Sequence, residues 1–365
     1  MGLRVVIAGG GTGGHLYPGI AVARELQARN PDAQISFAGT ARGIESRVVP
    51  REGFPLDLIR SGGVKGKSVV DCVRGASLVP LGLLDGWRIV SARRPDLVIG
   101  VGGYSSGPVV LVAALRGVPA MLLEQNAVPG LTNRLLARFV IAAAVSFDST
   151  QSFFGSKAFV SGNPVRPEFL ATTGPQQESG IEHQTSVTRV LVFGGSQGAH
   201  AINVAMVEAA SGLASGGSTL RLVHQTGERD VDMVRTAYRQ AGLQAVVEPF
   251  LYDMGRQFSI ADVIVCRAGA TTLAEITVAG KAAILIPLPT ATDDHQRKNA
   301  ETLASAGAAE VLLQRDVTGG VLAARLLALA GDRDRRQRMA AASRSLARPD
   351  AAKVIVDRAL ELVGK

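Results

Sequence analysis

Short apolar runs alternate with segments of helical length along nearly the whole of this 365-residue chain, and this alternation is what most constrains its fold. Strands that are buried on both faces of a parallel sheet read as continuous apolar runs. The pattern therefore predicts an α/β fold in which helices cover parallel sheets. The expected strands are 4–8, 34–38, 97–100, 120–123 and 140–145, followed by 190–193, 220–225, 245–248, 263–266 and 283–286.

The two series of strands indicate two α/β domains in succession, which the chain is long enough to form. The sequence GNPVR at 162–166 follows a short apolar run, and its proline indicates that the first domain ends there. The stretch 171–186 is polar and aperiodic, as expected of an exposed loop near a junction. We expect domains at 1–166 and 167–348, with a C-terminal helix at about 349–365 packing back on the first.

Composition and charge restrict the partners. Apolar residues make up 47% of the chain and charged residues 19%, which favours a folded protein over a disordered one. The net charge of +8 implies an anionic partner. Aromatic residues are only 4% of the chain, and no basic helix carries aromatic side chains to stack on bases, so we expect no nucleic-acid partner. An acidic lipid surface and a phosphorylated substrate remain as alternatives.

The sequence also indicates a compartment. Cys72 and Cys266 are far apart and fit neither a disulfide framework nor a zinc spacing. The N-terminus enters a strand and a glycine loop without the features of a signal peptide, and no apolar run approaches the roughly 18 residues of a membrane-spanning helix. We therefore expect a cytosolic protein that can touch a membrane. The neighbouring Asp293 and Asp294 are typical of a solvated turn, so we expect no metal.

Glycine loops follow expected strands at 9–15, 100–107 and 194–199. Their backbone N–H groups would gather at the carboxyl ends of the strands, where open α/β sheets bind ligands. A dinucleotide-binding dehydrogenase would need an acid at the end of the second strand, where this chain has Gly39 and Thr40. A P-loop is excluded because no glycine loop continues into GK and then Ser or Thr.

The sequence CRAGATTLAE, from Cys266 to Glu275, is suited to a nucleoside diphosphate. Gly269 permits a tight turn, and the N–H groups that open the following helix would point at phosphate oxygens. Glu275 lies one helical turn past Thr271 and could accept hydrogen bonds from two ribose hydroxyls. The alternative is an ordinary helix start with Glu275 on a solvated face, and this stretch alone does not decide between the two.

Motifs spread over most of the chain resemble, in their order, the family of bacterial glycosyltransferases that add N-acetylglucosamine to the lipid-linked muramyl-pentapeptide precursor of peptidoglycan. The motifs are GGGTGGHLYPGIAVA from Gly9, GTARGIESRVVPREGFPL from Gly39, RRPDLVIGVGGYSSGP from Arg93, EQNAVPGLTNRLLA from Glu124, GNPVR from Gly162, FGGSQGA from Phe193, HQTG from His224, PFLYDM from Pro249, CRAGATTLAE from Cys266 and DHQRKNA from Asp294.

The resemblance implies a GT-B fold, in which two Rossmann-like domains with parallel sheets face across a cleft. It implies inverting transfer from UDP-N-acetylglucosamine to the C4 hydroxyl of the muramyl sugar in undecaprenyl-diphosphate-linked lipid I, which forms lipid II. The protein would thus serve cell wall biogenesis, cell shape and cell division. The second domain would hold the nucleotide sugar and the first the lipid acceptor. The protein would be peripheral, on the cytoplasmic side of the membrane, without a cofactor; no protein partner is indicated.

The resemblance also implies site residues. Leu251 and Met254 would lie by the uracil, and Glu275 would hold the ribose. The residues implied for the diphosphate are Arg166, Ser196, Ala270, Thr271 and Thr272. Those implied for the sugar are Thr12, Gly13, Gly14, Asn126 and Gln296, and also His295, at a position where some members carry glutamine. Gln197, Leu273 and Ala274 are further expected substrate-binding residues.

Inverting transfer needs a base and a positive field for the departing diphosphate. His15 is the first candidate base, because a helix start disfavours the imidazolium; alternatively it only hydrogen-bonds the loop or a substrate phosphate. Glu124 is the second candidate, with an orienting role toward Asn126 as the alternative. Arg166 and Arg267 are the candidate counter-charges, although either could form an ordinary surface ion pair.

The segment from 65 to 94 mixes apolar side chains with cations. The apolar residues are Val69, Val70, Val73, Leu78, Val79, Leu81, Leu83, Leu84 and Trp87, and the cations are Lys65, Lys67, Arg74, Arg88, Arg93 and Arg94. Such a face suits an anionic membrane surface that the protein touches without crossing. The alternative is a pair of core helices with basic outer faces.

Other functions are compatible with parts of this pattern. Another GT-B glycosyltransferase with a different lipid acceptor or a natural-product acceptor would share the nucleotide half. A UDP-sugar epimerase would need no acceptor. A non-catalytic UDP-sugar-binding protein would give no turnover.

Overall fold

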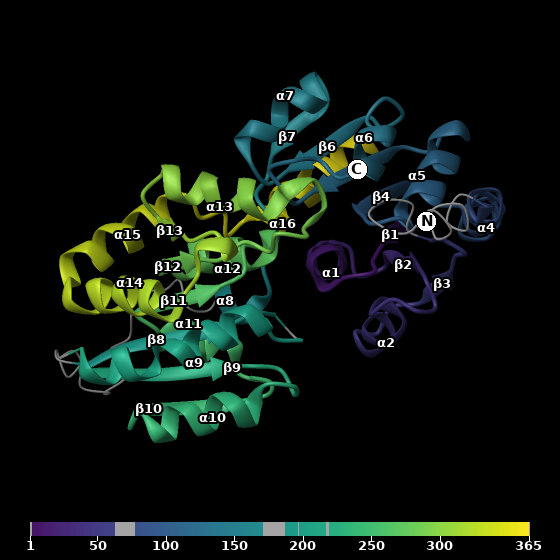
Figure 1. Cartoon of the computed structure of the whole chain (residues 1–365). Helices are drawn as coiled ribbons and strands as arrows, with labels where there is room; N and C mark the ends of the chain where they lie inside the picture. Colours follow the sequence, from purple (N-terminus) through teal and green to yellow (C-terminus); the bar gives the residue numbers. More distant parts are fainter. Residues whose placement is uncertain (1, 63–76, 171–186, 196, 217–218, 365) are drawn as a thin grey trace. The chain divides into compact units, whose positions relative to one another are not determined.

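The computed structural model describes residues 2–62, 77–170, 187–195, 197–216 and 219–364 (Figure 1). The chain divides into two compact units. Unit 1 comprises Met1–Arg166 with Arg348–Lys365, and unit 2 comprises Pro167–Ala347. Each unit has its own parallel sheet with helices on both faces, which confirms the expected α/β class with two Rossmann-like domains.

The sheet of unit 1 has the order β3-β2-β1-β4-β5-β6-β7, and all neighbouring strands are parallel. Its strands are β1 (Arg4–Gly9), β2 (Gln34–Gly39), β3 (Leu56–Leu58), β4 (Leu97–Gly102), β5 (Ala120–Glu124), β6 (Ala142–Val145) and β7 (Ala158–Val160). After β1 the chain adds β2 and β3 on one side of the sheet, and from β4 to β7 it adds strands on the other side. The switch point at which open α/β sheets bind ligands therefore lies between β1 and β4.

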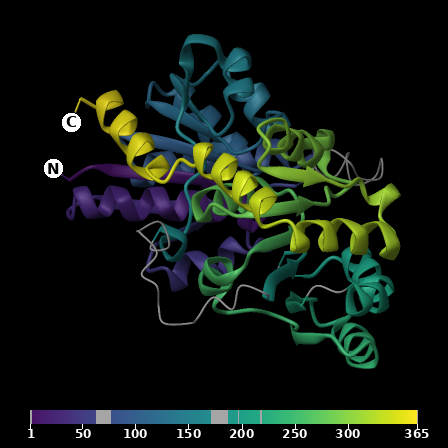
Figure 2. The ribbon, with the colours of Figure 1, turned by 90° about the vertical axis from the view of Figure 1, so that its left-hand side faces the viewer.

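Alternate residues of these strands enter two different cores. Val5 and Ile7 face a core completed by α1 (Gly13–Arg29) and the C-terminal α16 (Ala351–Leu362). Val6 and Ala8 face the opposite core, with α4 (Val79–Arg93) and α5 (Ser106–Leu115). Figure 2 shows α16 running beside α1, so the last helix of the chain belongs to unit 1. Shorter helices complete the unit: α2 (Glu45–Arg51), α6 (Leu131–Leu136) and α7 (Gln151–Phe154).

Unit 2 has the sheet order β10-β9-β8-β11-β12-β13, again with parallel neighbours and with the switch point between β8 and β11. Its strands are β8 (Val187–Phe193), β9 (Thr219–Gln225), β10 (Gln244–Glu248), β11 (Val263–Cys266), β12 (Ala282–Leu285) and β13 (Ala309–Val311). Its helices are α8 (Pro167–Leu170), α9 (His200–Ser215), α10 (Val231–Gln240), α11 (Met254–Ile260), α12 (Ala270–Ala279), α13 (His295–Ser305), α14 (Gly319–Gly331) and α15 (Arg333–Ser345). The main core of the unit lies between one sheet face and helices that include α9, α10 and α14.

Candidate active site

Two glycine loops meet at the switch point of unit 1. Gly9 at the end of β1 is paired with Gly102 at the end of β4, and both have positive φ, as do Gly10, Gly11 and Gly103. A Cβ atom on Gly103 would lie 2.6 Å from the carbonyl oxygen of Gly10. The loops thus approach so closely that only glycine fits, and backbone amides are concentrated where a ligand would bind.

Glu45 holds the first of these loops, although its role was not recognised from the sequence. Its side chain is fully buried, and Oε2 accepts a hydrogen bond from the Gly11 amide at 2.8 Å. Its Oε1 accepts from both the amide and the hydroxyl of Thr40, each at 2.8 Å. A Cβ atom on Gly10 or Gly39 would overlap the Glu45 side chain. The cluster of glycines around one buried glutamate is the sequence signal that could have identified it.

His15 lies in the first turn of α1 and is half-buried. Its Nδ1 is 3.2 Å from Oε1 of Gln125, and the Gln125 amide nitrogen donates to the carbonyl of Val101 at 3.0 Å. A Cβ atom on Gly102 would lie 2.8 Å from Nδ1. The backbone of β4 and the Gln125 side chain therefore hold the imidazole ring at the switch point.

Glu124, the second candidate base, is a buried anchor in the structure. Oε1 accepts from the amide of Asn126 at 3.0 Å and from its side-chain nitrogen at 3.4 Å. Oε2 accepts at 2.9 Å from both the Gly130 amide and the Asn133 side chain. Because both oxygens are bound by donors in the loop that follows β5 and in α6, the geometry favours the orienting role over that of a base.

The other expected residues of unit 1 lie around α1. Thr12 is the N-cap residue, and Gly13 and Gly14 form the first turn, at the positive end of the helix dipole. The guanidinium carbon of Arg166 lies 5.8 Å from the ring centre of Tyr17, on the second turn of α1. Thr12, Gly13, Gly14, His15 and Arg166 are thus carried on or beside one helix.

In unit 2, α12 begins directly after β11 at the switch point. Gly269 is its N-cap residue, and Thr271 and Thr272 in the first turn are partly exposed. Glu275 lies in the second turn and is only 3% exposed, so it is not on a solvated face. The helix start has the form expected of an anion site with a carboxylate one turn inside. Ala270, Leu273 and Ala274 belong to the same helix.

Gln296 and Arg267 support this region. Oε1 of Gln296 accepts from the amides of Ala268 and Leu288, at 3.2 and 3.0 Å. Arg267 donates to the carbonyls of Ile286 and Pro287 at 3.0 and 3.2 Å, and to Oε1 of Gln314 at 2.7 Å. The expected role of Arg267 as counter-charge to the diphosphate is therefore not favoured, because the structure uses its guanidinium to join strand ends.

Gln225 connects the glycine loop at 194–199 to the segment that carries Leu251. Its side-chain nitrogen donates to the Gly195 carbonyl at 2.8 Å, and its oxygen accepts from the Leu251 amide at 2.8 Å. Gln197 in this loop is exposed, whereas Ser196 lies outside the described residues. Met254 begins α11 and is partly exposed. Gln225 was not recognised from the sequence, although it stands in the HQTG motif.

A buried polar network lies behind the same loop. His224 is fully buried; its Nε2 is 3.0 Å from Oδ1 of Asn203 and its Nδ1 is 2.9 Å from the Tyr238 hydroxyl. Asn203 donates to the Thr226 carbonyl at 2.9 Å and to Asp230 at 2.8 Å. Desolvation by burial lowers the pKa of His224 to about 3, so the ring is neutral. This network is structural, as its complete burial implies.

The segment before α13 has an unusual backbone. Asp293 and Asp294 both have positive φ, of 54° and 55°, which is rare for residues other than glycine. Nδ1 of His295 is 2.6 Å from the Thr292 carbonyl. Such backbone conformations are found at ligand sites more often than elsewhere, and this one sets the start of the helix that carries Gln296.

The exposed face of α4 belongs to the segment expected to touch a membrane. Val79, Leu81, Leu84 and Trp87 are 39% to 54% exposed, and the guanidinium of Arg116 lies 4.5 Å from the Trp87 ring centre. Leu83, in contrast, is partly buried and packs against the core. The expected members that lie outside the described residues are Lys65, Lys67, Val69, Val70, Val73 and Arg74.

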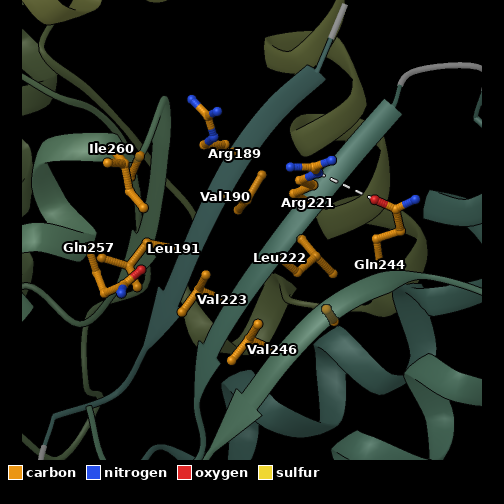
Figure 3. A pocket seen from close by; sticks show the side chains of 12 residues that line it. Arg189, Val190, Leu191, Arg221, Leu222, Val223, Gln244, Val246, Gln257 and Ile260 are labelled. Carbon is orange, nitrogen blue, oxygen red and sulfur yellow. Dashed lines mark hydrogen bonds between the residues drawn. The ribbon is translucent and has the colours of Figure 1, made fainter. Parts of the chain in front are cut away.

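A separate hollow of about 300 Å³ lies in unit 2, against β8, β9, β10 and α11 (Figure 3). Leu191, Val223 and Val246 line it, and Arg221 bonds with Gln244 at its edge, at 3.4 Å. These residues do not belong to the carboxyl-terminal loops of the strands, and the hollow includes none of the expected site residues. It therefore does not contribute to the candidate site.

Within the described part of the chain, His, Cys, Asp and Glu residues form no group suited to a metal ion. Among the same residues, no helix has the length and apolar character to cross a bilayer.

Family models cover both units. Residues 5–145 match the glycosyltransferase family 28 N-terminal domain, and residues 189–355 match the glycosyltransferase family 28 C-terminal domain. A UDP-N-acetylglucosamine--N-acetylmuramyl-(pentapeptide) pyrophosphoryl-undecaprenol N-acetylglucosamine transferase from Anaeromyxobacter sp. (strain Fw109-5) is 48% identical over 362 residues, which cover 99% of this chain and 94% of that protein.

Solved structures agree with this relationship. The crystal structure of MurG from Acinetobacter baumannii superimposes with a TM-score of 0.81 at 33% identity, and the match covers 98% of each chain. A UDP-GlcNAc 2-epimerase from Neisseria meningitidis, bound to UDP-GlcNAc, gives a TM-score of 0.68 at 14% identity over 99% of this chain and 100% of that chain. At that identity the second likeness shows only a shared fold.

Proposed function

Because this chain belongs to the MurG family of glycosyltransferases, we propose that it moves N-acetylglucosamine from UDP-N-acetylglucosamine to the C4 hydroxyl of the muramyl sugar of lipid I. The product is lipid II, in which a disaccharide is linked to undecaprenyl diphosphate. The observation that carries the proposal within the structure is the pair of switch points. Each unit has a glycine loop and a helix start there, one followed by His15 and the other by Glu275.

We propose that unit 2 binds the donor. The start of α12 is suited to the diphosphate, and Glu275, buried one turn further along, is suited to the ribose hydroxyls. Gln296 supports a sugar contact, because its oxygen is held by two backbone amides and its nitrogen is thereby turned in a fixed direction. Gln225 ties the glycine loop to Leu251 and keeps the segment proposed for the uracil at a constant distance from the phosphate loop.

Unit 1 then binds the acceptor, and His15 is the proposed base. The C4 oxygen forms a bond to C1 of N-acetylglucosamine on the face opposite the nucleotide, and the bond between C1 and the β-phosphate oxygen breaks. The C4 proton passes to the His15 ring, and UDP leaves with the electron pair of the broken bond. The backbone amides at the start of α12 and the guanidinium of Arg166 are the proposed donors to the departing diphosphate.

The exposed apolar face of α4 is the proposed contact with the anionic membrane in which the polyprenyl acceptor resides. Val79, Leu81 and Leu84 are exposed on it, and Arg88 and Arg116 are the neighbouring cations. Apolar side chains with cations at their border are the combination that rests on an anionic bilayer surface. We therefore propose a peripheral protein on the cytoplasmic side, where nucleotide sugars are available.

One assay tests the function against its alternatives. The protein is incubated with UDP-N-acetylglucosamine and a soluble lipid I analogue, and UDP release and the disaccharide product are followed together. We expect equal amounts of both, and neither without the acceptor. An isomerised UDP-sugar formed without acceptor would indicate an epimerase, and donor binding without either product would indicate a binding protein. Turnover only with another acceptor, such as diacylglycerol, would indicate a different glycosyltransferase.

A further inference from the structure

Gln125 is placed to determine which nitrogen of His15 carries the proton. It follows Glu124 at the end of β5 and is only 3% exposed. One side-chain atom lies 3.0 Å from the Val101 carbonyl oxygen, within buried β4. Because a carbonyl oxygen can only accept, that atom must be the amide nitrogen. The orientation of the amide is therefore fixed by the sheet, independently of His15.

This orientation turns the Gln125 carbonyl oxygen toward Nδ1 of His15, at 3.2 Å. An amide oxygen has no proton to give, so the hydrogen bond requires the proton on Nδ1. In the neutral ring, Nε2 is then the nitrogen that can accept a proton. The ring also lies against the backbone of Gly102, where an added Cβ atom would be only 2.8 Å from Nδ1.

A glutamine also differs from the carboxylate that often orients a catalytic histidine. A carboxylate would stabilise the imidazolium by its charge and would favour a protonated ring before the acceptor arrives. The neutral amide fixes the tautomer without that effect, and the start of α1 also disfavours the imidazolium. The amide thus selects the tautomer without adding a charge that would favour protonation of the ring.

We infer that Gln125 is a positioning residue that holds His15 as the Nδ1-protonated tautomer, with Nε2 directed to the acceptor hydroxyl. The inference rests on the proposed role of His15 as the base. Hydrogen bonds would thus connect Val101 in the buried strand β4, through Gln125, to the proposed base His15.

The test is the nitrogen NMR spectrum of the protein labelled with ¹⁵N-histidine, near neutral pH. The chain has only five histidines, and His15 is assigned by its loss in His15→Ala. We expect the wild-type His15 to show a protonated Nδ1 and an unprotonated Nε2. In Gln125→Met we expect a mixture of tautomers, with kcat lowered about 10- to 100-fold and KM for UDP-N-acetylglucosamine unchanged. Gln125→Glu places a carboxylate beside Nδ1 and should instead shift the ring toward the doubly protonated imidazolium, which a merely structural role of Gln125 would not do.

Gln151→Met, at an exposed position of the same unit, is the matched control and should change neither the spectrum nor the rate. Thermal unfolding of each variant shows that it is folded. A wild-type ring protonated on Nε2, or a Gln125→Met ring that keeps the wild-type tautomer, would overturn the inference. Normal turnover in His15→Ala would instead remove the base role while leaving the tautomer result intact, so the two failures are distinguishable.

Discussion

The buried carboxylates of unit 1 hold loops in position, whereas a carboxylate at an active site is usually expected to take part in the reaction. Glu45 and Glu124 each accept several hydrogen bonds from loop amides and side chains, and both are almost completely buried. Their oxygens hold the loops at the carboxyl ends of β1 and β5 in fixed positions. The proposed base, His15, lies in the first turn of the helix that follows the loop held by Glu45.

Replacing His15 and Glu124 should separate a chemical role from a structural one. His15→Ala should lower kcat by about 10²- to 10⁴-fold, as expected for loss of a general base, with the unfolding free energy unchanged within about 0.5 kcal/mol. Glu124→Ala leaves the Asn126 and Gly130 amides without their acceptor and should cost about 1–3 kcal/mol of unfolding free energy. Turnover and urea unfolding are measured on the same preparations. Near-normal turnover in His15→Ala would show that another group is the base.

Glu45→Gln should affect the acceptor site alone. The substituted amide can still present its oxygen to Thr40, but its nitrogen then faces the Gly11 amide, where two donors oppose each other. The first glycine loop should loosen, and kcat/KM for the acceptor should fall about tenfold, while KM for the donor stays constant. Glu52→Gln, at a partly exposed ion pair with Arg24, is the control and should be near wild type. An equal loss for donor and acceptor would contradict this role of Glu45.

The positions of the glycine loops could be predicted from sequence, because glycine after an apolar run is a local signal. The residues that hold the loops could not. Glu45 bonds with Gly11, which is 34 positions away along the chain, and Gln225 bonds with Gly195, which is 30 positions away. Nothing in the local pattern separates such a residue from an exposed one. The same applies to Arg267, whose bonds to strand-end carbonyls depend on the arrangement of β11 and β12.

At the scale of elements, the interior strands were predictable because both of their faces are buried and their apolar runs are uninterrupted. The strands that the sequence did not reveal are β3, β7 and β13, each of three residues at a sheet edge. Their residues are mostly only partly buried, so the continuous apolar run that marks an interior strand is absent. Edge strands of this length are defined by their neighbour in the sheet more than by their own sequence.

The element that tests the membrane contact is α4. Leu84→Glu places a charge on its exposed face without disturbing the core, and it should reduce co-sedimentation with vesicles containing anionic phospholipid. Turnover with a soluble lipid I analogue should not change. Val354→Glu is the matched control, because Val354 is exposed on α16, which covers the opposite face of the same sheet. Equal loss of vesicle binding in both variants would indicate a general effect of charge. Unchanged vesicle binding in Leu84→Glu would show that α4 does not contact the membrane.

At the scale of the whole molecule, the two units should respond differently to acid. Burial lowers the pKa of His224 in unit 2 to about 3, whereas the unfolded chain titrates near 6.5. Between these values the unfolded state binds more protons than the folded state, so the unfolding free energy of unit 2 decreases as the pH falls. The contribution of His224 is at most about 1.4 kcal/mol per pH unit. In unit 1, the Arg60 guanidinium lowers the pKa of Asp85, so that stabilisation is lost only below the ordinary range of a carboxyl group.

The single tryptophan makes this difference measurable, because Trp87 lies in α4 and its fluorescence reports on unit 1. Urea unfolding is followed by tryptophan fluorescence and by far-ultraviolet circular dichroism at pH 7 and pH 5. A transition seen by circular dichroism but not by fluorescence is assigned to unit 2, and we expect its midpoint to move to a lower urea concentration at pH 5. The midpoint of the transition seen by fluorescence should move less. In His224→Gln, which can still bond with Asn203 and Tyr238 but does not titrate, the shift between the two pH values should shrink. If it stays as large as in the wild type, the acid sensitivity of unit 2 arises from groups other than this buried histidine.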